Sequence, residues 1–188
     1  MMRDHDFWSD DAVTIEAQKS AKSRANQAKT IELIDSIGGL RGAVLDIGGR
    51  NLFTEILEQR YNISIDSTQG DLDLELNAPR RSYDFVHYNH VIEHQFNPLF
   101  TLLEIKKVLK PGGILILGTP MKSNWITWPN CHFHEFDEYR LMKLIVRAEY
   151  KIIKSVHFYH EVSIKGIRPL LGSFYKRLFI GLLTDNHH

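Results

Sequence analysis

The sequence has a single cysteine and no long apolar run, and each absence excludes a class of protein. Cys131 alone cannot form an internal disulfide, so nothing in the sequence indicates an oxidising compartment. No stretch approaches the roughly 18 apolar residues that span a bilayer, and no run typical of a signal peptide follows the charged N-terminus. We therefore expect a cytoplasmic protein.

The chain also lacks an excess of either charge. Lysine plus arginine and aspartate plus glutamate number 23 each, so no overall field attracts the protein to nucleic acid, and we expect no nucleic-acid partner. The length of 188 residues suffices for one domain with a complete hydrophobic core.

Two familiar nucleotide-binding patterns are missing as well. A dinucleotide fingerprint that began at Gly48 would need glycines where Arg50 and Phe53 stand, and no glycine is followed by Lys-Ser or Lys-Thr. These departures disfavour a nicotinamide-dependent enzyme and a nucleotide hydrolase.

What is present is an alternation of apolar strands and amphipathic helices. Unbroken apolar runs such as 114–117 are typical of a parallel sheet that is covered on both faces. The sequence therefore predicts a single α/β domain with a doubly wound, mostly parallel sheet and helices on both faces, a Rossmann-like fold. Strands are expected at 43–47, 63–66, 84–88, 114–117 and 151–156, and helices at 10–29, 30–36, 52–59, 97–109 and 137–148.

We divide the chain into an N-terminal helical segment (1–39), a core (40–160) and a basic amphipathic C-terminal segment (161–188). Apolar residues between Leu170 and Leu183 recur at helical spacing, and no acidic residue lies from Val162 to Thr184. Such a segment is suited to peripheral contact with an anionic membrane or to covering an acidic substrate. It equally suits a helix packed on its own domain or on a second copy in a homodimer.

The loop from Asp46 to Asn51 is the first candidate site. Glycine lets a backbone approach a ligand closely, and a following helix offers N–H groups and a positive dipole. By itself the loop also fits a plain turn. Asp66, at the expected end of the next strand, lies at the offset of a ribose-binding acid.

Several further segments occur in a specific order. They are Val44-Leu45-Asp46-Ile47-Gly48-Gly49, Ile65-Asp66, Tyr83-Asp84-Phe85-Val86, His90-Val91-Ile92-Glu93-His94, the run from Leu103 to Leu117, Gly118-Thr119-Pro120 and His134-Glu135-Phe136. With these segments, residues 40–156 resemble the class I S-adenosylmethionine-dependent methyltransferases, in particular their small type 11 branch.

The resemblance implies S-adenosylmethionine as the cofactor and assigns positions to it. Asp46 and Gly48 would lie beside its methionine part, Gly49 would also bind the cofactor, and Asp66 would bind its ribose. Asp71 and Leu72 would contact the adenine, and Asn89 and His90 would form the other wall.

The segment 1–39 would cover the cofactor site. Arg50 departs from the family pattern, which usually has a second glycine there. Arg50 is placed with the cofactor-binding residues because it could reach the cofactor carboxylate; alternatively it marks a weakened site.

Histidines are the candidate catalytic groups. His94, His132 and His134 are expected to flank the acceptor pocket, where an imidazole suits a general base near neutral pH; surface histidines are the alternative. His90 to His94 also matches the His-x-x-Glu-His zinc pattern, but the resemblance accounts for Glu93 and His94 without metal, so we expect none.

The predicted function is methyl transfer to a small-molecule or lipid-like acceptor. The alternatives are a catalytically silent subunit of the same fold, which serves as a binding or scaffold protein, and a zinc-dependent hydrolase.

Overall fold

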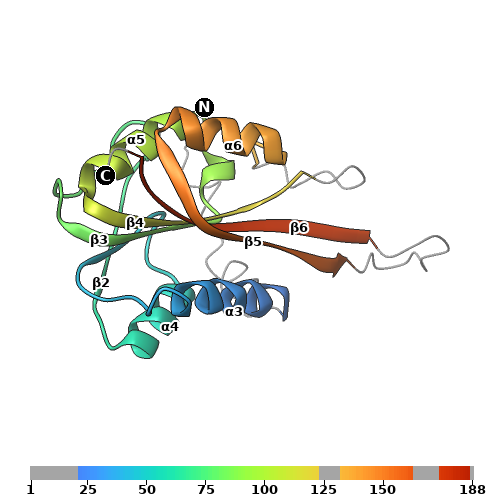
Figure 1. Ribbon diagram of the computed structural model, residues 1–188, viewed down its shortest axis with the longest axis horizontal. Helices are drawn as coiled ribbons and strands as arrows, with labels where there is room; N and C mark the ends of the chain where they lie inside the picture. Colours follow the sequence, from blue (N-terminus) through green and yellow to red (C-terminus); the bar gives the residue numbers. More distant parts are fainter. Residues whose placement is uncertain (1–20, 123–131, 163–173, 187–188) are drawn as a thin grey trace, which may run out of the picture.

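The computed structural model describes residues 21–122, 132–162 and 174–186, which form one six-stranded sheet with helices on both faces (Figure 1). The strand order is β2-β1-β3-β4-β6-β5. The strands are β1 (Val44–Asp46), β2 (Ile65–Ser67), β3 (Tyr83–Asn89), β4 (Leu109–Pro120), β5 (Tyr150–Val162) and β6 (Phe174–Asp185). The first four pair in parallel, and only β6 runs against its neighbours β4 and β5. The prediction of a mostly parallel, doubly wound α/β sheet is confirmed.

The helices divide between the two faces of the sheet. They are α3 (Ala21–Asp35), α4 (Leu52–Tyr61), α5 (Pro98–Val108), α6 (Glu138–Arg147) and the short 3-10 helix η1 (Ile92–His94). In Figure 1, α5 and α6 lie on one face and α3 and α4 on the other. Asn97 and Asp137 accept hydrogen bonds from the first turns of α5 and α6, so both predicted N-caps are present.

Alternating side chains of the central strands build two separate cores. Leu45 and Val86 belong to the core beneath α5 and α6, whereas Val44 and Phe85 belong to the core beneath α3 and α4. Because both faces are covered, central runs such as 44–45 and 114–117 are apolar without alternation, which is the pattern that the sequence shows.

The expected C-terminal helix is wrong over the part that the structure describes. Residues 174–185 form β6, which lies inside the sheet, and its side chains alternate between the cores, with Phe179 and Leu183 in one and Leu178, Ile180 and Leu182 in the other. These buried residues cannot face a membrane or a second copy. Residues 163–173 lie outside the described part, and none of the described helices is long and apolar enough to cross a membrane.

Three element boundaries also differ from prediction. Residues 21–35 form one helix rather than two, while residues 10–20 lie outside the described part. The Lys110 to Gly113 segment does not separate α5 from a later strand; β4 starts directly at Leu109, and the extra residues form a bulge opposite Tyr83 and Phe85. Strand β2 begins at Ile65 rather than at Ile63, because Asn62 ends α4 in a left-handed conformation and the Ile63 amide bonds back to Glu58.

Candidate active site

The candidate site lies where the strand order reverses. β1 has β2 on one side and β3 on the other, so the loops that follow β1 and β3 diverge from the same edge of the sheet. In open α/β sheets ligands bind at such a point, beyond the carboxyl ends of the strands. The Asp46 to Asn51 loop follows β1, and the segment from His90 to His94 follows β3.

Both glycines of the first loop have backbone conformations that favour glycine. Gly48 has φ +98°, and a Cβ there would lie 2.5 Å from Cγ2 of Val91, so the loops after β1 and β3 touch at this residue. Gly49 has φ +88°, but a Cβ there would meet no atom of the described residues within 4 Å. Gly48 therefore serves close packing, whereas Gly49 leaves its backbone open to a ligand.

Asp46, at the start of this loop, is buried, and its hydrogen bonds hold the loop in place. Its Oδ1 lies 2.8 Å from Nδ1 of His87 on β3, and its Oδ2 accepts a hydrogen bond from the Thr54 hydroxyl on α4. Thr68 adds a second brace, because its backbone N–H donates to the Asp46 carbonyl and its hydroxyl accepts from the Gly48 amide. The side-chain contacts of Asp46 thus join it to β3 and α4. The sequence patterns did not point to Thr54 or Thr68.

The N-terminus of α4 is capped by the protein itself. The Asn51 side chain accepts hydrogen bonds from the amides of Phe53 and Thr54, and the Thr54 hydroxyl in turn accepts one from the Asn51 amide. These amides are therefore not the open anion-binding donors that the sequence suggested. The pattern Asn-x-x-Thr before an amphipathic run was the available signal.

Arg50 points along α4 rather than across the loop. Its guanidinium forms a two-pronged ion pair with Glu58, and the same carboxylate accepts a bond from the Ile65 amide. Hydrogen bonding by Arg50 lowers the pKa of Glu58. Since Arg50 does not have a positive φ, this position has no conformational need for the usual glycine.

Asn89 and His90 form the other wall. The Asn89 side chain packs against Gly118 of β4, where a Cβ would collide with its Oδ1. His90 has φ +57°, which is unusual for a residue other than glycine, and its amide donates to the Gly118 carbonyl. Its half-exposed ring lies between Asn26 of α3, at 3.3 Å, and Glu93, at 3.4 Å. The first described helix thus contacts the site at His90.

Asp66, Asp71 and Leu72 follow β1 along the chain. Asp66 lies inside β2, opposite Leu45, and its exposed carboxylate accepts a hydrogen bond from the Tyr83 hydroxyl at 3.0 Å. Burial, and then this bond, raises the pKa of Tyr83 to about 12, so the hydroxyl remains a donor at neutral pH. Asp71 is exposed and opens a turn, in which its side chain accepts from the Asp73 amide.

A buried polar chain fixes Leu72 relative to β3. The Tyr88 hydroxyl donates to Gln95, whose amide donates to the Thr101 hydroxyl, and that hydroxyl donates to the Leu72 carbonyl. Because every link is buried or partly buried, the chain holds the 72 loop to β3 and α5.

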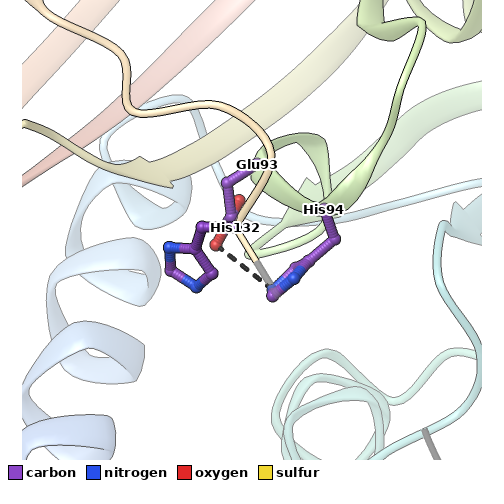
Figure 2. A group of neighbouring side chains, drawn as sticks. All are labelled: Glu93, His94 and His132. Atoms are coloured by element: carbon purple, nitrogen blue, oxygen red, sulfur yellow. Dashed lines mark ion pairs between the residues drawn. The ribbon is translucent and has the colours of Figure 1, made fainter. Parts of the chain in front are cut away.

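The predicted histidines separate into two environments (Figure 2). His94 and His132 lie edge to face with ring centroids 4.6 Å apart, beside the buried carboxylate of Glu93. His134 instead stacks on Phe136, and its Nε2 is buried. Burial would raise the pKa of Glu93, but the nearby His90 and His94 outweigh it and lower that pKa, so Glu93 is ionised.

The His-x-x-Glu-His pattern does not form the helical metal site that it suggests. His90 precedes η1 in a left-handed conformation, so His90 and His94 do not share a helix face. His87 of β3 is buried against Asp46.

Comparison with known proteins agrees with this geometry. Residues 7–167 match the model of a methyltransferase domain family, so the chain belongs to that family. It therefore contains a methyltransferase domain, and its fold is Rossmann-like. No curated protein sequence matches it.

Two solved structures illustrate the shared fold. A SAM-dependent methyltransferase from Archaeoglobus fulgidus has a TM-score of 0.63 at 12% identity, over 93% of this chain and all of its own. The 1,6-didemethyltoxoflavin-N1-methyltransferase of Burkholderia thailandensis, solved with S-adenosylhomocysteine and its substrate, has a TM-score of 0.62 at 15% identity, over 98% and 92% of the two chains.

Proposed function

We propose that the protein transfers a methyl group from S-adenosylmethionine to a small-molecule acceptor that binds between the β1 loop and the segment from Glu93 to His132. One observation carries the proposal. Gly48 packs directly on Val91, so the glycine loop and the imidazole cluster lie on the same edge of the sheet.

The residues present fit the cofactor. The backbone of Gly49 is open on the side where a Cβ would stand, and the other wall is set by His90. On this proposal Gly48, Gly49 and His90 hold the methionine part, Asp66 binds the ribose, and Asp71 and Leu72 border the adenine. When bound, the cofactor supplies a methyl group already activated on a sulfonium, so the chain's task is mainly to align the acceptor.

His94 and His132 stand on the acceptor side of this arrangement. His94 is 20% exposed, so it can be reached from solvent, and Oε1 of Glu93 lies 3.9 Å from its Nε2. An imidazole in that place can accept a proton from a hydroxyl or amine acceptor. His134, with its ring against Phe136, has a supporting role on this proposal.

The acceptor has a flat apolar part. Phe96 and Phe133 are 70% and 45% exposed, and their rings lie 4.0 Å apart, next to the His94–His132 pair on the same two segments. Exposed aromatic rings that pair beside polar groups are suited to bind a planar molecule.

Calorimetry with S-adenosylhomocysteine, followed by a screen of planar acceptors with labelled S-adenosylmethionine, tests the proposal. We expect binding to the unaltered chain and weaker binding, by roughly tenfold, to Asp66→Asn, since this removes a charged acceptor of ribose hydrogen bonds. Asp35→Asn is a matched exposed control on α3 and should bind as the unaltered chain does. Absence of binding to the unaltered chain would overturn the proposal.

A further inference from the structure

Glu93, His94 and His132 form a compact group that the proposed methyl transfer leaves partly unexplained. Their nearest ligand atoms, one per residue, all lie within 4.8 Å of one another (Figure 2). Oε1 of Glu93 and Nε2 of His94 are 3.9 Å apart, which is too far for a hydrogen bond. One atom of each of the three side chains is nevertheless close enough to the other two for a single ion to be held among them.

The surrounding backbone holds this group in place. The His134 amide donates to the Glu93 carbonyl at 3.1 Å, so the segment that carries His132 is joined to η1. Glu93 is 1% exposed, and its Oε2 accepts from the Thr119 hydroxyl at 3.2 Å, which ties it to β4. Oε1 is left facing the imidazoles.

Two imidazoles and one carboxylate are a common ligand set for divalent transition metals. Catalytic zinc sites use three such protein ligands and leave a position open, and non-haem iron sites use the same residue types. Ligands about 2.0–2.1 Å from a tetrahedral ion lie ~3.4 Å from one another. The upper limit of 4.8 Å exceeds this separation by about 1.4 Å, so the three atoms need to approach by at most that distance, which side-chain rotations cover.

We propose that Glu93, His94 and His132 bind a divalent first-row transition-metal ion, with an open coordination position directed to the acceptor. The ion would compensate the buried carboxylate, which otherwise faces only imidazoles and a hydroxyl. Soft sulfur ligands are absent from the group, and the two nitrogens disfavour Mg²⁺, which prefers oxygen.

The position of the group points to the class of acceptor. Val91, two residues before Glu93, touches Gly48 of the cofactor loop, so an ion at this site lies at the acceptor side of that loop. With the ion bound, His94 and His132 would act as ligands rather than as bases, and an oxygen acceptor on the ion would lose its hydroxyl proton to water more readily. Its lone pair then forms the O–CH₃ bond while the S–CH₃ bond breaks, and the sulfur retains that electron pair as a neutral thioether. This assignment of a hydroxyl acceptor rests on the proposed function, whereas the ion site does not.

Metal titration of the full chain, stripped with a chelator, tests the site. We expect one equivalent of Zn²⁺ to bind by calorimetry, Co²⁺ to give a visible absorption band, and Mg²⁺ to bind much more weakly. His94→Ala, His132→Ala and Glu93→Gln should each weaken Zn²⁺ binding by roughly 100-fold or more, because ligand loss exceeds the effect of second-sphere changes. His157→Ala, which removes a histidine on β5, should bind Zn²⁺ unchanged.

Several results would overturn the inference. They are no stoichiometric Zn²⁺ binding by the unaltered chain, binding that survives loss of both histidines, and an equal loss in His157→Ala. Because Glu93 is buried and its variant could misfold, circular dichroism of each variant is recorded, and His132→Asn provides a second, milder ligand change.

S-adenosylhomocysteine binding, measured on the same samples, separates the two proposals. If the unaltered chain binds S-adenosylhomocysteine but no Zn²⁺, the ion site alone is contradicted. Metal binding without any S-adenosylhomocysteine binding contradicts the proposed function alone.

Discussion

The carboxylate of Asp46 and the imidazole of His87 lie 2.8 Å apart between neighbouring strands, directly below the glycine loop. The two residues are opposite one another in the register of β1 and β3, and both are buried. Because a carboxylate only accepts hydrogen bonds, Nδ1 of His87 carries the proton between them. This pair connects the strands on either side of the switch point, so the geometry of the loop depends on it.

Asp46→Asn should destabilise the fold by about 3 kcal/mol, because it removes one member of a buried, hydrogen-bonded pair. Equilibrium unfolding in urea measures this loss. Asp35→Asn, at an exposed ion pair with Arg60, is the control and should leave the urea midpoint nearly unchanged. Equal effects of the two substitutions would contradict the bracing role of Asp46.

Gly48→Ala should cost about 2 kcal/mol of folding free energy, since it combines a positive φ with a collision against Val91. Val91→Ala removes the colliding methyl groups, so the double variant should be more stable than the sum of the two single effects predicts. A double-mutant cycle by urea unfolding measures this coupling. Strict additivity would show that the loops after β1 and β3 do not touch here.

Gly49→Ala should affect stability less than Gly48→Ala does. Its φ is also positive, but the new Cβ meets no described atom, so the loss of stability should be only about 1 kcal/mol. Its affinity for S-adenosylhomocysteine should fall by more than roughly tenfold, because the methyl group enters the space assigned to the ligand. Calorimetry with unchanged affinity would remove Gly49 from the site.

Arg50→Ala should leave S-adenosylhomocysteine affinity within about twofold of the unaltered chain, because the guanidinium is paired with Glu58 on the solvent side of α4. The same calorimetric assay measures the S-adenosylhomocysteine affinity of Arg50→Ala, with Glu58→Gln as the matched variant. A large loss in Arg50→Ala alone would mean that Arg50 leaves Glu58 to bind the cofactor carboxylate.

Acid should weaken the fold partly through Asp84. A hydrogen bond from Lys110 lowers the pKa of Asp84. Partial burial opposes this shift, and a hydrogen bond from the Ala43 amide adds to it. The unfolded chain therefore takes up this proton first as the pH falls, so the stabilisation is present above about pH 4 and is lost below it. Urea midpoints between about pH 5 and pH 3 should fall less steeply in Asp84→Asn. Urea midpoints that fall equally steeply with pH in the unaltered chain and in Asp84→Asn would contradict this role of Asp84.

Much of the fold could be predicted from local patterns. The strand before Gly48, the Asn97-Pro98 start of α5 and the Asp137 cap each depend on a few neighbouring residues, and the structure has them where the sequence placed them. The C-terminal strand was missed for a physical reason. β6 is buried on both faces, so its apolar residues do not alternate with polar ones, and a run of that kind also fits helical spacing.

The sequence predicted which segments form the candidate site, but not which side-chain contacts those segments make. The order of the Gly48-Gly49, Glu93-His94 and Lys110 to Gly113 segments indicated the family, and the match over residues 7–167 confirms it. The direction of the Arg50 side chain depends on its ion pair with Glu58, and the tolerance of a residue other than glycine depends on the φ angle at that position. The loop sequence shows neither of these. Asp66 also shifted from the end of a strand into its middle, because the cap of α4 delayed the start of β2.

The sequence by itself determined the class of this protein, because local periodicity and short motifs depend on residues that are neighbours in the chain. Only the tertiary structure decided which side chains lie beside the segment that follows β3. His132 comes to lie beside Glu93 and His94 through the backbone bond between His134 and Glu93, and β6 enters the sheet between β4 and β5. Such contacts join residues that are distant in the chain, and their free energy comes from packing and burial that no single segment contains.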